Sequence, residues 1–151
     1  MTAPILSLPT LYLDVPGTPV PQGSKIRNRW AGVRESNAAA LDPWRGTITA
    51  HAQRACTQQG WTRAAGPVTV HATFRLPRPA GHYGTGRNAN TLRPAAPVVP
   101  ATKPDLDKLV RAVLDAITAA GTVWADDARV VEITAAKVYG TPGATIRVEA
   151  W

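Results

Sequence analysis

The sequence predicts an α/β (α+β) fold, a single domain in which a mixed β-sheet packs against two main helices. Three observations indicate this class. A chain of 151 residues is long enough for one domain with its own core. Its composition, 44% hydrophobic and 18% charged, is that of a folded globular chain. Segments with strand and helix patterns follow one another in the order β, α, β, α, β, β. We therefore expect residues 1–151 to form one domain.

The N-terminal half supplies the first strand and the first helix. Residues 11–15 have the pattern of a short strand. Residues 16–34 are punctuated by Gly and Pro and carry many charges, which predicts a loop or hairpin with a basic rim. Asp42 and Pro43 have the pattern of an N-cap followed by proline at the first helical position. A helix is expected from there to a stop at Gly60.

The C-terminal half supplies the second helix and three strands. Alternating β-formers predict a strand at 68–76. Residues 77–102 contain five prolines and three glycines, which predicts a long loop. Asp105, after Pro104, opens a helix with an apolar stripe that ends at Gly121. The last two strands and the turn between them are expected at 130–139, 145–149 and 140–143.

Basic residues outnumber acidic ones, and the chain carries a formal net charge of +7. Such a charge favours binding to a polyanion, nucleic acid above all. Thirteen of the seventeen cationic residues are arginine, whose planar guanidinium suits bidentate phosphate contacts.

Cysteine usage and the N-terminus indicate the compartment. Cys56 is the only cysteine, which excludes an intrachain disulfide and a four-cysteine zinc site and favours a reducing environment. Residues 1–17 have neither a basic signal-peptide start nor an unbroken apolar span. A cytoplasmic protein without membrane contacts is expected.

The acidic residues are concentrated in one segment of this basic chain. A nuclease combines cations that hold phosphates with a small group of carboxylates that holds a divalent metal, whereas solubility requires no such crowding. Six of the ten acidic residues lie within 28 positions: Asp105, Asp107, Asp115, Asp126, Asp127 and Glu132.

Two pairs of carboxylates are the candidate metal ligands. Asp105 and Asp107 stand in the first turn of the expected helix, where one of them can alternatively serve as its N-cap. Asp126 and Asp127 precede the next strand. We expect the fold to bring both pairs to one place, where their repulsion requires a cation. Mg²⁺ in such a site polarises a phosphodiester and activates a water molecule.

Arg111 lies four residues after Asp107 and four before Asp115, so the three side chains share one helix face. One reading is an ordinary i,i+4 ion pair. The other is a fixed cation that stabilises the scissile phosphate in the transition state. An arginine does not serve as a proton donor as a lysine can. Asp115 is interpreted as a structural partner of Arg111 rather than as a ligand.

The pattern D-L-D-x-L-x-[KR]-x-x-x-D-A, followed some ten residues later by D-D and an apolar strand, resembles the RusA family. These proteins are the Holliday-junction resolvases, or crossover junction endodeoxyribonucleases, of bacteria and prophages. The upstream G-T-P-V-P and the cations after it also resemble that family's basic N-terminal segment. The similarity in order covers roughly residues 11–150. The matching residues of the main motif are Asp105, Leu106, Asp107, Leu109, Arg111, Asp115, Ala116, Asp126 and Asp127.

The resemblance implies a homodimer that nicks a four-way DNA junction symmetrically, leaving 5′-phosphate and 3′-hydroxyl ends. It implies Mg²⁺ as cofactor, with Mn²⁺ able to substitute. It also suggests a phage or prophage origin, with the protein located in the cytoplasm of the bacterial host. Asp105, Asp107 and Asp127 correspond to the metal carboxylates, and Asp126 lies beside them. Where the family has a functional lysine this chain has Arg111. The two matched nicks agree with a two-fold dimer that presents two equivalent sites.

Basic side chains are expected to hold the arms of the junction through their phosphates. Tyr83, in the Gly-rich part of the long loop, and Trp30, in the basic segment, can additionally contact bases. The predicted DNA-binding residues are Lys25, Arg27, Arg29, Arg34, Arg87, Lys103 and Lys108.

Other candidate sites have weaker support. Residues 81–88 are Gly-rich but lack the G-K-[ST] ending of a phosphate loop, so no nucleotide cofactor is expected. The three histidines lie in separate elements without ligand spacing, and nothing around Cys56 resembles a thiol catalyst.

Two rival functions stay open at this point. The first is a broader branched-DNA or flap endonuclease without preference for four-way junctions. The second is a non-catalytic basic DNA-binding protein in which Asp105 and Asp107 only cap a helix. The second predicts junction binding without Mg²⁺-dependent cleavage.

Overall fold

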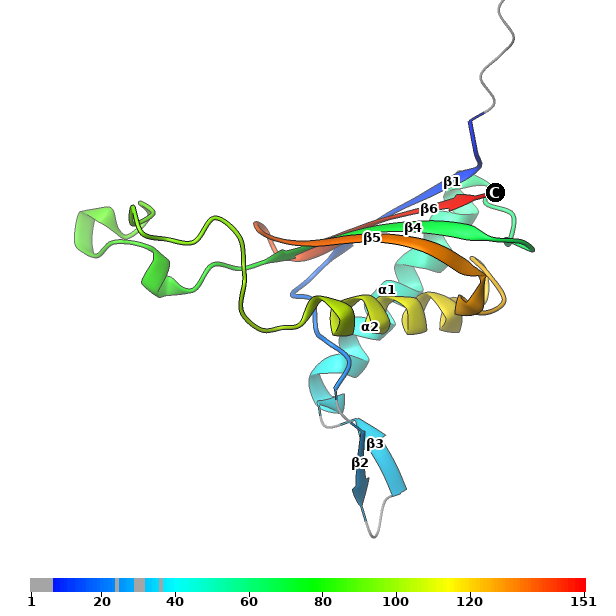
Figure 1. The fold of residues 1–151 in the computed structure, drawn as a ribbon, viewed down its shortest axis with the longest axis horizontal. Helices are drawn as coiled ribbons and strands as arrows, with labels where there is room; N and C mark the ends of the chain where they lie inside the picture. The colour runs from blue at the N-terminus through cyan, green and yellow to red at the C-terminus, as the bar shows by residue number, and fades with distance from the viewer. Residues whose placement is uncertain (1–6, 24, 29–31, 36) are drawn as a thin grey trace, which may run out of the picture.

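The computed structural model describes residues 7–23, 25–28, 32–35 and 37–151. A four-stranded mixed sheet is covered on one face by two helices, and a small hairpin and a long loop extend away from this body (Figure 1). The strand order is β1-β6-β4-β5; β4 and β5 are parallel and the other neighbours antiparallel. The predicted fold class is confirmed. The strands are β1 (Thr10–Pro16), β4 (Val68–Leu76), β5 (Val130–Tyr139) and β6 (Gly143–Ala150).

The strands with the clearest patterns have the predicted bounds. β4 and β5 match the expected ranges residue for residue. β6 begins two residues before the predicted start, at Gly143. A Cβ atom at that position would lie 2.7 Å from the carbonyl oxygen of Val15, so the close approach of β1 there favours glycine.

Helix α1 (Ala38–Gln59) begins earlier than predicted. The expected start at Asp42 and Pro43 is wrong, because three alanines with high helix propensity extend the helix upstream and Pro43 lies inside it. The backbone carbonyl of Asn37 accepts the amides of Ala40 and Leu41, at 3.0 and 2.9 Å. The predicted stop is confirmed, since Gly60 adopts the left-handed conformation with φ 65°.

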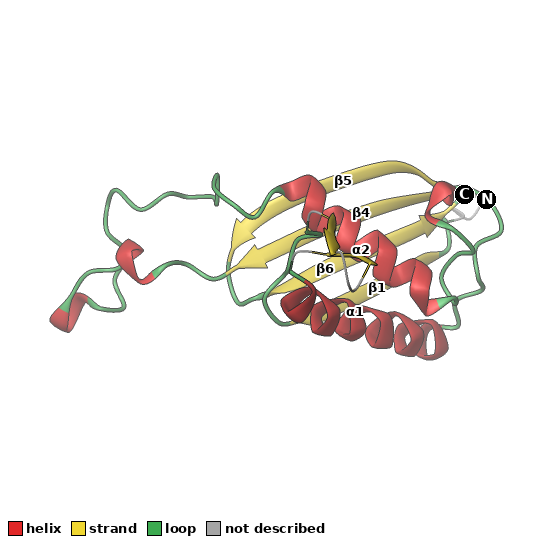
Figure 2. Ribbon diagram, turned by 90° about the horizontal axis from the view of Figure 1, so that it is seen from below, coloured by secondary structure: helices red, strands yellow, loops and turns green. Residues whose placement is uncertain are grey.

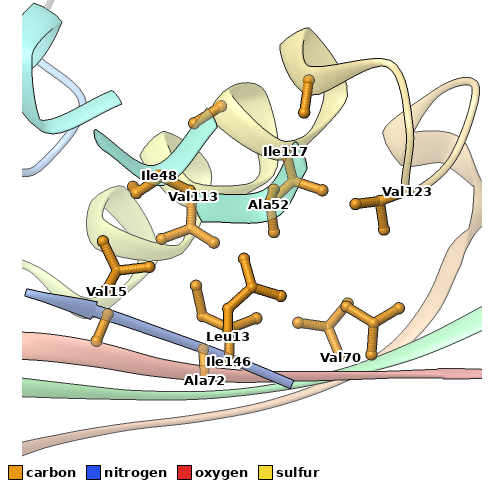
Figure 3. Packing of buried hydrophobic residues seen from close by; sticks show 14 of the residues in the cluster. Leu13, Val15, Ile48, Ala52, Val70, Ala72, Val113, Ile117, Val123 and Ile146 are labelled. Atoms are coloured by element: carbon orange, nitrogen blue, oxygen red, sulfur yellow. The ribbon is translucent and has the colours of Figure 1, made fainter. Parts of the chain in front are cut away.

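Helix α2 (Leu106–Ala120) packs beside α1 on the same face of the sheet, and Gly121 ends it with φ 72°. Its apolar stripe meets α1 and the inward-facing side chains of the sheet. In Figure 3 helix side chains point toward strand side chains across one continuous core, and the labelled residues include Ile48 and Ala52 of α1, Val113 and Ile117 of α2, and Val70, Ala72 and Ile146 of the sheet.

The basic N-terminal segment forms a hairpin, which settles the choice between loop and hairpin. Strand β2 (Lys25–Asn28) pairs antiparallel with β3 (Gly32–Glu35). In Figure 1 this hairpin lies well apart from the sheet, beyond the start of α1.

The long loop at 77–102, here called the arm, projects from the end of β4 (Figure 2). It contains two short 3₁₀ turns, η1 (Ala80–His82) and η2 (Gly86–Asn88). Its base is held by Tyr139, because the Arg78 guanidinium lies 4.3 Å from the centre of that ring and the His82 ring packs against it in a T-shaped arrangement. The arm therefore has a defined base on the sheet.

No helix in the described part of the chain is both long and apolar enough to span a membrane.

Candidate functional site

The first carboxylate pair lies at the start of α2. The backbone of Asp105 occupies the N-cap position, and its carbonyl accepts the amide of Leu109 at 3.1 Å. Its side chain caps no amide and lies 3.9 Å from the Nζ atom of Lys108. Asp107 is exposed in the first helical turn. The carboxylate of Asp105 therefore does not serve as the N-cap, which was the structural alternative to a metal role.

A cavity of about 440 Å³ opens beside this end of α2. Asp105 lines it together with two predicted DNA-binding residues, Lys103 and Lys108. The segment that leads into β2 forms another wall, because the amide of Gln22 donates to the carbonyl of Lys108 at 2.9 Å. The base of the basic hairpin is thus tied to the first turn of α2.

Lys137 of β5 fixes the chain that enters α2. Its Nζ atom donates to the carbonyls of Thr102 and Pro104, at 2.8 and 2.9 Å. Sequence reasoning missed this residue. The strand pattern of residues 130–139 does not indicate this role, because the carbonyls that Lys137 binds lie more than thirty residues earlier in the sequence.

The second carboxylate pair lies immediately before β5. Asp126 caps the short turn η3 (Asp127–Arg129), since its Oδ1 atom accepts the amide of Ala128 at 2.7 Å. Asp127 is exposed in that turn. One oxygen of Asp126 therefore has a structural partner, whereas Asp127 presents its carboxylate to solvent.

The single chain does not bring the two pairs together. Asp105 follows the segment held by Lys137, whereas Asp127 precedes Val130 at the other end of β5. Seven steps of extended strand between Val130 and Lys137 span about 23 Å. Helix α2 covers a similar length, about 22 Å for its 15 residues. Figures 1 and 2 show the start of α2 and the start of β5 at opposite ends of the molecule's helical layer.

The expectation that one chain gathers Asp105, Asp107, Asp126 and Asp127 is therefore wrong. Among the residues that the structure describes, no three Asp, Glu, His or Cys side chains are placed to hold a metal. The reason is topological. Helix α2 and strand β5 run in opposite directions and are joined by a short connection, so the residues that precede each lie far apart.

Arg111 is exposed on the second turn of α2. Within the described chain it forms no ion pair with Asp107 or Asp115, so the interpretation of Asp115 as its structural partner is wrong. Its guanidinium remains on the face of α2 that carries Asp107, one turn further along the helix.

The predicted DNA-binding residues lie on three parts of the molecule. Lys103 and Lys108 flank Asp105, and Arg87 is exposed on η2 of the arm. The backbones of the remaining described ones lie in the hairpin, Lys25 and Arg27 in β2 and Arg34 in β3. Arg29, like Trp30, lies outside the described residues.

Other reactive side chains fit structural roles. Cys56 is buried, and this burial raises the pKa of its thiol, which disfavours a reactive thiolate. His71 lies 3.6 Å from Glu149 on the far face of the sheet, and His82 holds the arm. A role for His82 was missed because its partner, Tyr139, is remote in sequence.

Residues 16–149 match the family described as Endodeoxyribonuclease RusA. The chain belongs to the RusA family. The match includes both carboxylate pairs, the hairpin, the arm and all of β5, so it extends well beyond the aspartate motif. Comparison with curated proteins gives no match. As a member of this family the protein is an endodeoxyribonuclease of the Holliday-junction-resolving class.

Proposed function

We propose that this RusA-family endonuclease resolves four-way DNA junctions by Mg²⁺-dependent, paired hydrolysis of two symmetry-related phosphodiesters. The observation that carries the proposal is the start of α2. There the exposed carboxylates of Asp105 and Asp107 lie among the cations Lys103, Lys108 and Arg111. Such a mixture suits a metal ion and a phosphate bound side by side.

The donor atoms fit Mg²⁺ or Mn²⁺. Asp105 and Asp107 of one chain, with Asp127 of the partner subunit in the proposed homodimer, would supply hard carboxylate oxygens, which these ions prefer. Asp126, with one oxygen bound to the amide of Ala128, fits a role beside the ligands. The buried thiol of Cys56 is not part of this set. When bound, the metal polarises the phosphodiester and lowers the pKa of a bound water.

The chain's own cations position the DNA. Lys103 and Lys108 line the cavity that also contains Asp105, so a phosphate there meets both charges. Arg111, one turn further along, stabilises the negative charge that develops on the phosphate. Because arginine stays protonated, Arg111 contributes a fixed charge and transfers no proton.

The hairpin and the arm extend the contact surface. The hairpin starts beside the first turn of α2, and the arm returns to it through Lys103. Both segments carry cations that match the backbones of two junction arms. We also propose that the protein acts in the cytoplasm, where four-way DNA junctions are found.

The testing experiment is cleavage of a synthetic four-way junction beside a flap, a Y-form and a duplex of matched sequence. We expect paired symmetric nicks in the junction with Mg²⁺ or Mn²⁺, and none with EDTA. Equal cleavage of the flap and Y-form would favour the broader branched-DNA nuclease. Binding without cleavage in either metal would contradict the catalytic proposal.

Replacing the cations at the start of α2 should weaken the salt dependence of junction binding. In Lys103→Gln/Lys108→Gln, the slope of log K against log salt concentration should become shallower by about one for each phosphate that the variant no longer neutralises. Fluorescence anisotropy with a labelled junction in Ca²⁺ measures this slope. Arg63→Gln, an exposed cation outside the proposed site, is the matched control. An unchanged slope in the double variant would place the phosphates elsewhere.

A further inference from the structure

We infer that the base of the arm forms a pocket for one unpaired nucleobase of the DNA strand whose phosphate lies beside Asp105. The inference rests on the proposed function, because it assumes branched DNA at the start of α2, and it adds a contact to a base. The pocket, here called the arm pocket, is a cavity of about 370 Å³. Its lining includes Arg78, Tyr83, Val98, Val99 and Tyr139.

A third cavity lies between the arm pocket and the start of α2. It has a volume of about 240 Å³ and is here called the passage. Lys103 and Pro104 line both the passage and the cavity that contains Asp105. Tyr139 lines both the passage and the arm pocket. The three cavities are therefore neighbours, and a DNA strand that passes Asp105 can continue to the arm pocket.

The distance along this path is short. Lys137 donates to the carbonyl of Pro104 at 2.9 Å, and Tyr139 lies two residues further along β5. Two residues of extended strand span about 7 Å. Successive phosphates of one DNA strand are about 3.4 Å apart along the axis of a duplex. The arm pocket therefore lies within a few nucleotides of a phosphate bound beside Asp105.

The lining of the arm pocket suits the flat face of a base. Val98 is 83% and Val99 52% exposed, and both line the pocket with Tyr83 and Tyr139. Phosphates and sugars do not cover such apolar side chains, whereas the face of a base packs on aromatic and aliphatic groups. The volume of about 370 Å³ is also within the range of sites that hold small ligands.

Arg78 is held in place by the protein itself. Its Nη1 atom donates to the carbonyl of Pro97 at 2.7 Å, and its guanidinium carbon lies 4.3 Å from the centre of the Tyr139 ring. These contacts restrict the side chain, so it loses little conformational freedom when a base packs against it. A guanidinium stacks on bases and also attracts the phosphate of the same nucleotide.

Tyr83 is positioned through its backbone. Its amide donates to the carbonyl of Ala80 at 3.1 Å, and its carbonyl accepts the Nε atom of Arg93 at 2.7 Å. It also pairs with Leu92 in an isolated β-bridge. None of these three contacts uses the phenol ring, so the ring can be removed by substitution while the contacts that shape the arm remain.

The charge of the arm favours DNA as the occupant over an acidic or apolar protein segment. Residues 77–104 contain four cations and no acidic residue, a composition that attracts a polyanion. In a duplex each base is stacked and paired, so only a base that has left the stack enters a pocket. Such bases occur where strands exchange. The arm pocket therefore takes a base from the branch point of the junction.

A double-mutant cycle between protein and DNA tests the pocket. Each nucleotide next to the branch point is replaced in turn by an abasic one, in both symmetry-related strands of a four-way junction. Fluorescence anisotropy in Ca²⁺ measures the affinity of wild type and Tyr83→Ala. Loss of the aromatic ring should weaken binding of the intact junction by about tenfold. At one position the abasic nucleotide should weaken wild-type binding similarly and Tyr83→Ala binding no further.

Two variants are the controls of this cycle. Tyr83→Phe keeps the ring and should bind like the wild type. Tyr12→Ala removes a tyrosine that is 58% exposed on β1 and lines none of the three cavities, so it should also bind like the wild type. Additive losses at every position overturn the inference. A loss in Tyr12→Ala equal to that in Tyr83→Ala overturns it as well.

A photochemical crosslink identifies the pocket without cleavage. Iodouracil at the coupled position should become attached to Tyr83 or Tyr139 on irradiation in Ca²⁺, and mass spectrometry of the peptides locates the attachment. Attachment only outside the arm and the end of β5 overturns the inference. So does a change in the sedimentation of DNA-free Tyr83→Ala, because the pocket would then hold a second copy of the chain.

The outcomes for the pocket and for the proposed function are distinguishable. A wild type that binds the junction but never cuts it in Mg²⁺ or Mn²⁺ contradicts the function, and the cycle and the crosslink still decide the pocket. A wild type that cuts the junction, with additive losses at every position and no crosslink to Tyr83 or Tyr139, overturns the pocket and leaves the function standing.

Discussion

Asp107→Asn and Asp127→Asn should each reduce cleavage of a four-way junction by about a thousandfold or more. Asparagine keeps the shape of the side chain and loses the negative charge that a divalent cation requires. Both residues are exposed, so neither substitution should disturb the core. Single-turnover cleavage in Mg²⁺ measures the loss.

Junction affinity separates catalysis from binding. Removing a carboxylate beside a phosphate site relieves repulsion of the DNA, so affinity in Ca²⁺ should be unchanged or higher in both variants. Asp42→Asn, an exposed aspartate of α1 outside the proposed site, should cleave like the wild type. Retained cleavage in Asp107→Asn or Asp127→Asn would remove that residue from the ligand set.

Secondary structure was predictable where local chemistry was unambiguous. Strands β4 and β5 alternate or are rich in β-formers along their whole lengths, and glycine in the left-handed conformation ends both helices. The start of α1 was not predictable from its Asp-Pro signal. Three alanines and the backbone of Asn37 begin the helix upstream of Pro43. Local propensity there outweighed a recognised start signal.

The candidate residues of the site could be predicted, but their arrangement could not. The spacing of the aspartates indicates which side chains are chemically suited to hold a metal, and their roles stay predictions. The spacing of the aspartates does not indicate that α2 and β5 run in opposite directions, which separates Asp105 from Asp127 within one chain. Contacts between residues remote in sequence could not be predicted from the sequence either. Examples are the contacts of Lys137 with Pro104 and of His82 with Tyr139.

Electrostatics and topology together connect the fold to the proposed reaction. The basic hairpin, the base of the arm and the start of α2 meet at one end of the molecule, whereas Asp127 lies at the other.

Trp124→Ala should lower the free energy of unfolding by about 3–5 kcal/mol. Trp124 is 0% exposed, and its Nε1 atom donates to the hydroxyl of Thr118 at 2.8 Å. Its neighbour Val123 accepts the amide of Ala64 and the indole of Trp61, at 2.9 and 3.0 Å. These contacts hold the connection from α2 to η3, so truncation opens a cavity and loosens the turn that carries Asp127.

The conservative variant separates the two parts of that effect. Trp124→Phe keeps most of the buried surface and removes the bond to Thr118, so it should cost about 1–2 kcal/mol. Urea unfolding at one fixed protein concentration measures the free energy of unfolding of both variants. Trp151→Phe, at a position 67% exposed, should change stability by less than about 1 kcal/mol. A Trp124→Ala protein as stable as Trp151→Phe would show that this connection does not depend on the buried indole.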